Sequence, residues 1–418
     1  MTYSQAVSYL RQTNRAFCKP GIERVQTLAS AFGDPHKDLS VIHVTGTNGK
    51  GSFCVLTEQM LVSAGLRVGR FSSPALVRIN ECVAVNGQPI SDEAFARLVE
   101  RLRPVAEGLS DRPTEFELLT VLAFLYFKEQ ACDVVLAECG MGGLTDATNL
   151  IESPLLSVIT GVSVDHSSFL GSTVEEIAFQ KAGIIKANCP VLWCGTDGKA
   201  EKVIRAVAQE KNAPFYTVAR SMLRIRSCGI DGTVFDFNGK ENLSLSLLGT
   251  YQAENAANAL TAVEILFPAL PEQALRAGLR SACWPGRFEI LSRNPLVIAD
   301  GGHNPEGVDR AVESIEAYFP QEKVTFVTGI MADKDYRTVA RRMCSVAGRV
   351  FCVTPENARA LPAEEYAEVF RSFGVDAEAC ASVKDALAAA AAVGSPVICL
   401  GSLYMYAEIR RVMEESEK

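Results

Sequence analysis

The sequence predicts an α/β protein with two domains: an N-terminal domain built on a parallel sheet with a small antiparallel appendix, and a C-terminal Rossmann-like domain. Three observations support this prediction. Short apolar runs alternate with helical patterns from residue 41 to residue 193, an apolar/polar alternation interrupts them at 223–248, and a second series of strands begins at residue 296. With 418 residues and 48% hydrophobic composition, the chain is long enough for two cores.

The first domain contains five predicted strands, each a short run rich in apolar residues: 41–45, 67–71, 133–138, 155–160 and 190–193. Helical patterns lie between them at 52–64, 91–102, 115–129 and 173–185. This alternation indicates a mostly parallel sheet covered by helices.

A different pattern follows the first domain's helices. Apolar and polar residues alternate around Asn238-Gly239, which predicts an antiparallel hairpin that forms the appendix. After a helix at 252–267 and a turn at 284–286, strands are predicted at 296–299, 324–328, 350–353 and 397–400. We therefore divide the chain into domains at 1–287 and 288–418.

The composition excludes several classes of protein. A formal net charge of −8 argues against a surface for nucleic acid or anionic membranes, although a local basic pocket for a small anion remains possible. The thirteen cysteines form neither a C-x-x-C pair nor a Cys/His cluster, and the N-terminus lacks a signal segment. The uncharged stretch 386–407 is divided by Gly394-Ser-Pro396, so it predicts no membrane span. We expect a cytoplasmic protein.

A glycine-rich loop, Gly-Thr-Asn-Gly-Lys-Gly-Ser at 46–52, follows the first predicted strand directly. Glycines let successive backbone N–H groups face one anion, and the lysine adds a positive charge. An extra glycine separates the lysine from the serine, so the loop departs from the usual G-x-x-x-x-G-K-[ST] motif. A tight connection would explain the glycines alone, but the lysine after a hydrophobic strand favours a P-loop ATPase-type nucleotide site. The candidate residues are Thr47, Asn48, Gly49, Lys50, Gly51 and Ser52.

Two further loops follow strands of the first domain, at the edge where open α/β sheets bind ligands. Glu138 ends an apolar strand, and a carboxylate there suits Mg²⁺, which prefers hard oxygen ligands. Without the phosphate loop, a turn-capping role would be the better interpretation of Glu138. Asp165 and His166 follow the next strand, and His166 is one of four histidines in the chain. For His166 the residues leave a structural role and a ligand role open.

Three other charged positions are less specific. Lys181 lies in a helical pattern, where most lysines are solvated, and its spacing alone indicates no function. The segment Asp300-Gly-Gly-His303-Asn-Pro305 follows a strand of the second domain, which is typical of a ligand loop but also of a plain strand-to-helix turn. Arg287 either clamps a phosphate or forms an interdomain ion pair.

Taken together, these segments resemble the folylpolyglutamate synthase/dihydrofolate synthase family of the Mur ligase superfamily over nearly the whole chain. The resemblance rests on motifs that occur in the family's order: residues 46–52, Ser73-Pro74 with Arg78-Ile-Asn-Glu81, Thr114-Glu-Phe-Glu117, Glu138 with Gly142-Gly143 and Asp146-Ala-Thr-Asn149, Asp165-His166, Lys181-Ala-Gly-Ile-Ile-Lys186, Gln252 with Asn255, Trp284-Pro-Gly-Arg287, Asp300-Gly-Gly-His-Asn-Pro305, Asp333-Lys-Asp335 and Gly401-Ser-Leu403.

The resemblance implies an ATP-dependent amide ligase. In such an enzyme a folate-type carboxylate takes the γ-phosphoryl group of ATP, and the α-amine of L-glutamate displaces phosphate from the acyl phosphate. The family contains enzymes that add the first glutamate to dihydropteroate, enzymes that extend the tail of reduced folates, and enzymes that do both. We expect a bifunctional enzyme, with a monofunctional folylpolyglutamate synthase as the alternative.

The resemblance also implies roles for individual residues. The implied catalytic residues are Lys50, His166, Lys181 and His303. ATP would be bound by the phosphate loop together with Asn255, Arg287 and Asp300. Two Mg²⁺ ions are implied, held by Ser73, Glu138, His166 and Lys181, and the lysine at the last position is commonly carbamoylated in the family. The pterin would lie near Thr114, Glu115, Phe116, Glu117, Thr145, Asp146 and Ala147.

Five positions depart from the usual family pattern: Ala75, Cys82, Leu144, Gln180 and Gly302, where His, Arg, Arg, Glu and Ala are usual. The residues implied to bind phosphate are unchanged. Three of the departures, Ala75, Cys82 and Leu144, fall on loops that border the pterin or the interdomain cleft in the family. Either the preference for the folate substrate is shifted or these changes are neutral.

Two other functions are weighed against the folate ligase. Ligases that join amino acids to UDP-linked sugars match the Gly51 insertion and the 284–287 element less well. A non-catalytic ATP-binding relative would have lost catalytic residues that this chain keeps. We expect a monomer that binds neither nucleic acid nor membranes and takes dihydropteroate or reduced folate and L-glutamate as substrates.

Overall fold

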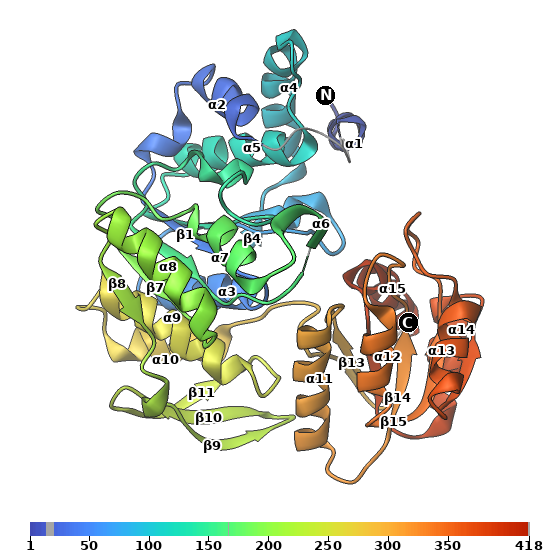
Figure 1. Ribbon diagram of the computed structural model, residues 1–418. Helices are drawn as coiled ribbons and strands as arrows, with labels where there is room; N and C mark the ends of the chain where they lie inside the picture. The colour runs from blue at the N-terminus through green and yellow to red at the C-terminus, as the bar shows by residue number, and fades with distance from the viewer. Residues whose placement is uncertain (14–20, 166, 417–418) are drawn as a thin grey trace. The chain divides into compact units, whose positions relative to one another are not determined.

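The computed structural model describes residues 1–13, 21–165 and 167–416 (Figure 1). They form two compact units: Met1–Met222 together with Glu254–Ala282, and Leu223–Ala253 together with the chain from Cys283 onward. The second unit resumes close to Arg287, where the sequence analysis placed a domain boundary. That boundary stays a prediction about separately folding domains.

An eight-stranded sheet forms the centre of the first unit, in the order β4-β3-β2-β5-β1-β6-β7-β8. The strands from β2 to β8 in this order run parallel, whereas β3 and β4 add antiparallel at one edge. The five predicted strands are confirmed, and β3, β4 and β8 extend the sheet. The strand bounds are β1 Val41–Thr45, β2 Val68–Phe71, β3 Val83–Val85, β4 Gln88–Pro89, β5 Val134–Glu138, β6 Leu156–Ile159, β7 Val191–Trp193 and β8 Phe215–Thr217.

The helices of the first unit are α1 Tyr3–Gln12, α2 Glu23–Ser30, α3 Lys50–Ser63, α4 Asp92–Gly108, α5 Glu115–Glu129, α6 Ser167–Leu170, α7 Val174–Ala182, α8 Gly198–Glu210, α9 Gln252–Leu266 and α10 Glu272–Ser281. Helices α1, α2, α4 and α5 share one hydrophobic core with β2 and β5. Helices α7 and α8 lie side by side in Figure 1 and share a second core with β6 and β7. Because β1, β2 and β5 run parallel, their carboxyl ends lie at one edge of the sheet.

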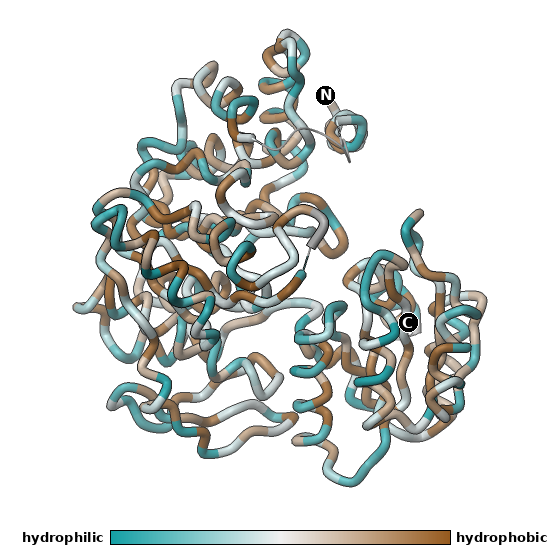
Figure 2. The backbone as a smooth tube through the Cα atoms, viewed as in Figure 1, coloured by the Kyte–Doolittle hydropathy of each residue, from teal (hydrophilic) through white to brown (hydrophobic). Residues whose placement is uncertain are grey.

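The second unit contains a six-stranded sheet in the order β12-β13-β17-β14-β15-β16, parallel except for β12. Its strands are β12 Glu289–Arg293, β13 Leu296–Asp300, β14 Val324–Thr328, β15 Ala347–Cys352, β16 Asp376–Ala379 and β17 Val397–Leu400, and its helices are α11 Pro305–Tyr318, α12 Tyr336–Met343, α13 Ala363–Ser372, α14 Val383–Val393 and α15 Tyr406–Ser416. Hydrophobic and hydrophilic segments alternate along α11 in Figure 2, as expected for a helix with one face on the core. This is the predicted Rossmann-like α/β arrangement.

The predicted hairpin is confirmed, with one more strand than expected. β10 (Gly232–Phe237) and β11 (Lys240–Leu245) pair antiparallel, and the two turn residues Asn238 and Gly239 have φ values of 47° and 81°. β9 (Arg224–Gly229) adds a third strand. The sequence analysis placed this sheet in the first domain, and that division stays a prediction. By its contacts the sheet groups with the second unit, where the Gly249 N–H donates to Tyr318 Oη of α11 (2.7 Å).

Among the described residues, we find no helix with both the length and the apolar character that a membrane crossing requires.

Candidate functional site

The glycine-rich loop joins the end of β1 to the start of α3. Gly49 directly precedes the helix, has a φ of 84° and offers no side chain to cap it. The first N–H groups of α3 therefore face the loop without a side-chain cap, which is a common setting for anion binding. The Lys50 ammonium donates to the carbonyls of Gly46 (3.0 Å) and Thr47 (3.2 Å), so it lies across the same loop.

The segment after β6 holds the loop in place. Thr160 Oγ1 donates to the Asn48 carbonyl (2.7 Å), and the Ser163 N–H donates to Thr47 Oγ1 (3.0 Å). These bonds fix the loop's backbone without using the amides of the first turn of α3.

Helix α9 also reaches the loop. A Cβ atom built on Gly49 would lie 2.8 Å from Asn255 Oδ1, so the Asn255 side chain approaches the loop backbone closely. Gly51 and Ser52 form the first turn of α3, where Ser52 is buried. The first unit thus brings Asn255 together with the predicted loop residues.

Glu138 ends β5 beside β1, with Val44 as its register partner. Its side chain is 5% exposed, and Oε1 lies 3.9 Å from the Lys50 ammonium. On the other side of β5, Phe71 of β2 pairs with Ala137, so Ser73 follows the neighbouring strand end. The predicted metal ligands Ser73 and Glu138 therefore come from adjacent strand ends next to the phosphate loop.

These residues fit a magnesium ion. Across the described ranges no group of three or more His, Cys, Asp or Glu side chains is arranged to coordinate a metal ion. Mg²⁺ does not need such a group, because it commonly uses one or two protein oxygens together with waters and substrate phosphates. A buried carboxylate and a serine hydroxyl beside a phosphate loop are ligands of this type.

Lys181 lies near the end of α7 and is 3% exposed. Burial lowers the pKa of its amine to about 7, and the positive charge of Lys50 acts in the same direction. Asp165 lies close enough to oppose the shift, while His166 lies outside the described residues. A lysine with this pKa is partly neutral at pH 7, and a neutral amine can act as a nucleophile.

Two of the predicted pterin residues are used to start helix α5. Thr114 and Glu117 form a capping box, in which the Thr114 N–H donates to Glu117 Oε2 (2.7 Å). Arg24 also pairs with Glu117, at 2.9 Å from Oε1. Phe116 instead packs toward the sheet edge, with its ring 5.6 Å from that of Phe71. Unlike Thr114 and Glu117, Phe116 takes no part in the capping box.

The Asp146 carboxylate organises its own loop. It accepts the Met141 N–H (3.0 Å) and the Thr148 hydroxyl (2.6 Å). His43 of β1 in turn contacts the same hydroxyl through Nε2 (2.7 Å), and burial lowers the pKa of His43 to about 3. Because Thr148 donates to Asp146, neutral His43 donates to Thr148. Thr145 is exposed and Ala147 is buried in this loop.

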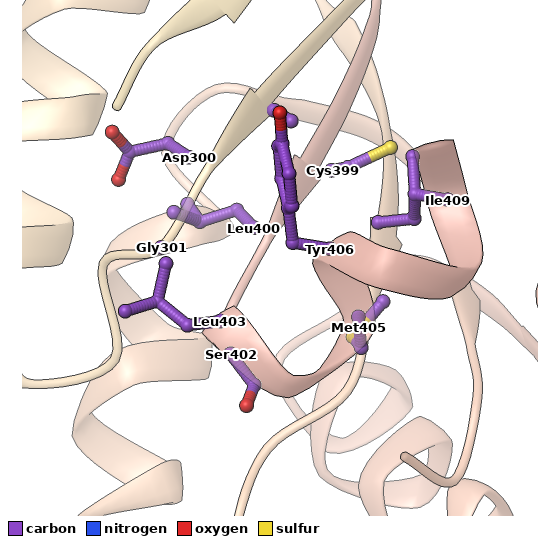
Figure 3. A pocket seen from close by; sticks show the side chains of 10 residues that line it. Asp300, Gly301, Cys399, Leu400, Ser402, Leu403, Met405, Tyr406 and Ile409 are labelled. Carbon is purple, nitrogen blue, oxygen red and sulfur yellow. The ribbon is translucent and has the colours of Figure 1, made fainter. Parts of the chain in front are cut away.

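The second unit holds Arg287, Asp300 and His303 near the carboxyl end of β13. The Asp300 carboxylate accepts the Gly302 N–H (2.7 Å) and the Phe288 N–H (2.9 Å). His303 Nδ1 lies 2.9 Å from the Gly301 carbonyl, which can only accept, so this nitrogen carries the proton. Figure 3 shows a small pocket at the ends of β13 and β17, but its volume of about 10 Å³ holds one water at most.

Sequence reasoning missed the residues that support the site. His43 and Arg24 were not predicted, and Thr148 was named only as part of the motif at 146–149. His43 is a polar residue within an apolar strand and so carried a weak signal. Their partners are remote in the chain: His43 and Thr148 are 105 residues apart. No pattern of neighbouring residues in the sequence predicts such pairs.

Comparison with known proteins gives consistent matches over the whole chain. The model of the Mur ligase middle domain matches residues 44–263, and that of the Mur ligase glutamate ligase domain matches residues 286–403. The chain is 36% identical to dihydrofolate synthase/folylpolyglutamate synthase of Bacillus subtilis over 427 residues, covering 98% of each. It is 32% identical to the Escherichia coli protein of the same name over 416 residues, covering 98% of this chain and 94% of the relative.

Solved structures match equally well. Folylpolyglutamate synthase from Thermotoga maritima superposes with a TM-score of 0.88 at 33% identity, covering 99% of this chain and 97% of that one. Folylpolyglutamate synthase of Mycobacterium tuberculosis, complexed with ADP and AMPPCP, gives a TM-score of 0.90 at 27% identity and covers 98% of both chains.

Proposed function

Because the chain belongs to the dihydrofolate synthase/folylpolyglutamate synthase family of Mur ligases, we propose that it is an ATP-dependent ligase that joins L-glutamate to folate-type carboxylates. The phosphate loop carries this proposal, with Lys50 across it and Glu138 Oε1 3.9 Å from the ammonium. We propose the bifunctional form, since the B. subtilis and E. coli relatives carry both names.

The proposed reaction has two steps. A carboxylate oxygen of the pterin substrate attacks the γ-phosphorus of ATP, the bond from phosphorus to the bridging oxygen breaks, and ADP leaves. The α-amine of L-glutamate then attacks the acyl carbon and loses a proton, while inorganic phosphate leaves with the electrons of the broken C–O bond. Both steps depend on holding negative charge and excluding water.

The chain's own residues supply this charge stabilisation. The uncapped amides at the start of α3 and the Lys50 ammonium would hold the phosphates, with Asn255 against the loop. In the second unit, Arg287 and Asp300 would contribute to nucleotide binding. His303, with Nδ1 protonated toward Gly301, would present its other ring nitrogen to the phosphoryl group.

Ser73 and Glu138 would hold one Mg²⁺, and Lys181 with His166 would hold a second. When bound, the metal would neutralise negative charge on the phosphates. An ammonium would repel a cation, so Lys181 is suited to this role as a carbamate, formed when its neutral amine attacks CO₂ and loses a proton. The lowered pKa of Lys181 supports this proposal, because burial favours the neutral amine.

For the substrate side, we propose that the pterin lies between the start of α5 and the loop around Asp146. Phe116 supports this, since its ring packs against Gly140 as well as Phe71.

Two departures from the family pattern, Leu144 and Gln180, are neighbours, with the Leu144 N–H donating to the Gln180 carbonyl (2.8 Å). The two departures therefore lie at one place in the first unit rather than at two separate sites.

The test is glutamate-dependent ADP release from purified enzyme with ATP and Mg²⁺, comparing dihydropteroate, tetrahydrofolate and no pterin. Release with both pterins supports the bifunctional enzyme, and release with tetrahydrofolate alone supports the elongating alternative. Binding of ADP without release under any condition would support a non-catalytic relative. Mass spectrometry of the products identifies the number of glutamates added. We further propose that the active enzyme is a monomer, which sedimentation of the active enzyme would check.

A further inference from the structure

Arg287 lies in an unusual turn of the second unit. The residues on both sides have left-handed backbone conformations, with φ of 69° at Gly286 and 46° at Phe288. Glycine adopts such angles freely, but a bulky residue does so only where its surroundings enforce it. Phe288 is fully buried, so the strain lies at an ordered position directly after Arg287.

Two carboxylates hold this turn. Asp300 Oδ2 accepts the Phe288 N–H (2.9 Å), and Glu289 Oε2 accepts the Gly286 N–H (2.8 Å). The Gly301 N–H donates to the Gly286 carbonyl (2.9 Å), which ties the turn to the end of β13. The direction of the Arg287 side chain is therefore set by hydrogen bonds to its neighbours.

Both oxygens of the Asp300 carboxylate accept hydrogen bonds. Besides Phe288, Oδ2 accepts the Tyr251 hydroxyl (3.2 Å), and Oδ1 accepts the Gly302 N–H (2.7 Å). Burial, followed by the charge of Asp300, raises the pKa of Tyr251 well above its usual value, so the hydroxyl stays protonated and remains a donor. Figure 3 shows the Asp300 carboxylate pointing away from Tyr406.

Arg287 is close to this carboxylate but is not paired with it. A Cβ atom on Gly301 would lie 2.9 Å from Arg287 Nη1, so the guanidinium packs on the residue after Asp300. Within residues 1–13, 21–165 and 167–416, no hydrogen bond or ion pair engages the guanidinium. A half-buried arginine beside a carboxylate would normally pair with it, because bidentate pairing is strong.

We propose that Tyr251 is a positioning residue for nucleotide binding: by occupying Asp300 Oδ2 it stabilises the left-handed turn and keeps Asp300 from pairing with Arg287, so the guanidinium stays available for an anionic phosphate of ATP. This inference rests on the proposed function. A substrate carboxylate has the same kind of charge as a phosphate, and the experiment separates the two sources.

The experiment compares Tyr251→Phe with wild type. Phenylalanine keeps the ring and removes the donor, which leaves Oδ2 open to Arg287. We expect the KM for ATP and the Kd for ADP to rise about tenfold, the usual scale for a lost bond to a charged group, with kcat within about twofold. The matched control is Tyr404→Phe on an exposed tyrosine, which should change neither constant.

A double-mutant cycle distinguishes positioning from a general loss of structure. If Tyr251 acts through Arg287, Tyr251→Phe should not weaken ADP binding further in the Arg287→Ala background, although thermal unfolding can still shift. Three results would each overturn the inference. They are additive effects of the two substitutions on ADP binding, an unchanged Kd for ADP in Tyr251→Phe, and a rise in Tyr251→Phe that is confined to the KM for L-glutamate or the pterin. Wild-type enzyme that binds no ADP would overturn the proposed function as well.

Discussion

Replacing Lys181 by methionine tests the electrostatics of the buried amine. The ordinary pKa of 10.5 applies in the unfolded chain, and the folded value is about 7. Between these values the unfolded chain holds a proton that the folded chain lacks, so the free energy of unfolding rises with pH through this window. One proton contributes about 1.4 kcal/mol per pH unit. Below pH 7 both states are protonated, and burial of the charge is a constant penalty.

Methionine fills a similar volume and cannot ionise. We expect Lys181→Met to be more stable than wild type below pH 7, and the difference to shrink by roughly 2–3 kcal/mol between pH 7 and pH 9. The assay is urea unfolding followed by circular dichroism at each pH unit, under CO₂-free gas so that the amine is unmodified. Lys199→Met is the matched control, because the Lys199 side chain is 72% exposed.

Parallel pH curves for wild type and Lys181→Met would refute this reasoning, since they would show that the amine keeps its ordinary pKa. If the amine does titrate near pH 7, carbamate formation should need the neutral form. ADP release in the presence of bicarbonate should then rise from pH 6 to pH 8. Unmodified Lys181 in a peptide mass map of active enzyme, prepared without acid, would contradict the carbamate.

Three further changes have defined outcomes. Glu138→Gln keeps the side chain's size but removes its charge, so ADP release should fall at least about a hundredfold with unchanged circular dichroism; near-normal turnover would contradict the metal role. Gly49→Ala forces alanine to a φ of 84° and against Asn255 Oδ1, so urea unfolding should show a loss of about 1–2 kcal/mol and calorimetry weaker ADP binding. His43→Gln keeps a donor for Thr148, whereas His43→Leu should destabilise by about 1–3 kcal/mol; equal urea midpoints would argue against the bond.

The conformation of the glycine-rich loop and the hairpin could be predicted because their signals are local. A loop that must bring backbone amides together needs glycine at fixed positions, and Gly49 does adopt a left-handed φ of 84°. The turn at Asn238-Gly239 needs two left-handed residues in succession, which few other pairs allow. β9 was missed because its sequence is polar and largely exposed, so its strand state depends on pairing with β10.

The supporting residues could not be predicted because their roles depend on partners far away in the chain. Arg24 pairs with Glu117 across 93 positions, and the Tyr251 hydroxyl meets Asp300 across 49. The left-handed conformation of Phe288 leaves no trace in the sequence at all, because phenylalanine is among the residues least suited to it. Sequence patterns identify residues that face a ligand more readily than the residues that hold them.

Lys50 and Lys181 of the first unit lie close enough for their positive charges to repel each other. Lys50 lies across the loop that we propose binds phosphate, and its positive charge adds to the cost of a second ammonium at Lys181. Losing a proton relieves that cost, and the proposed addition of CO₂ to the neutral amine would go further by placing an anion near Lys50. An exposed lysine would keep its proton, and so would neither react with CO₂ nor accept a cation beside it. Burial of Lys181 therefore favours the neutral amine that the proposed carbamate requires, and the charge of Lys50 favours it further.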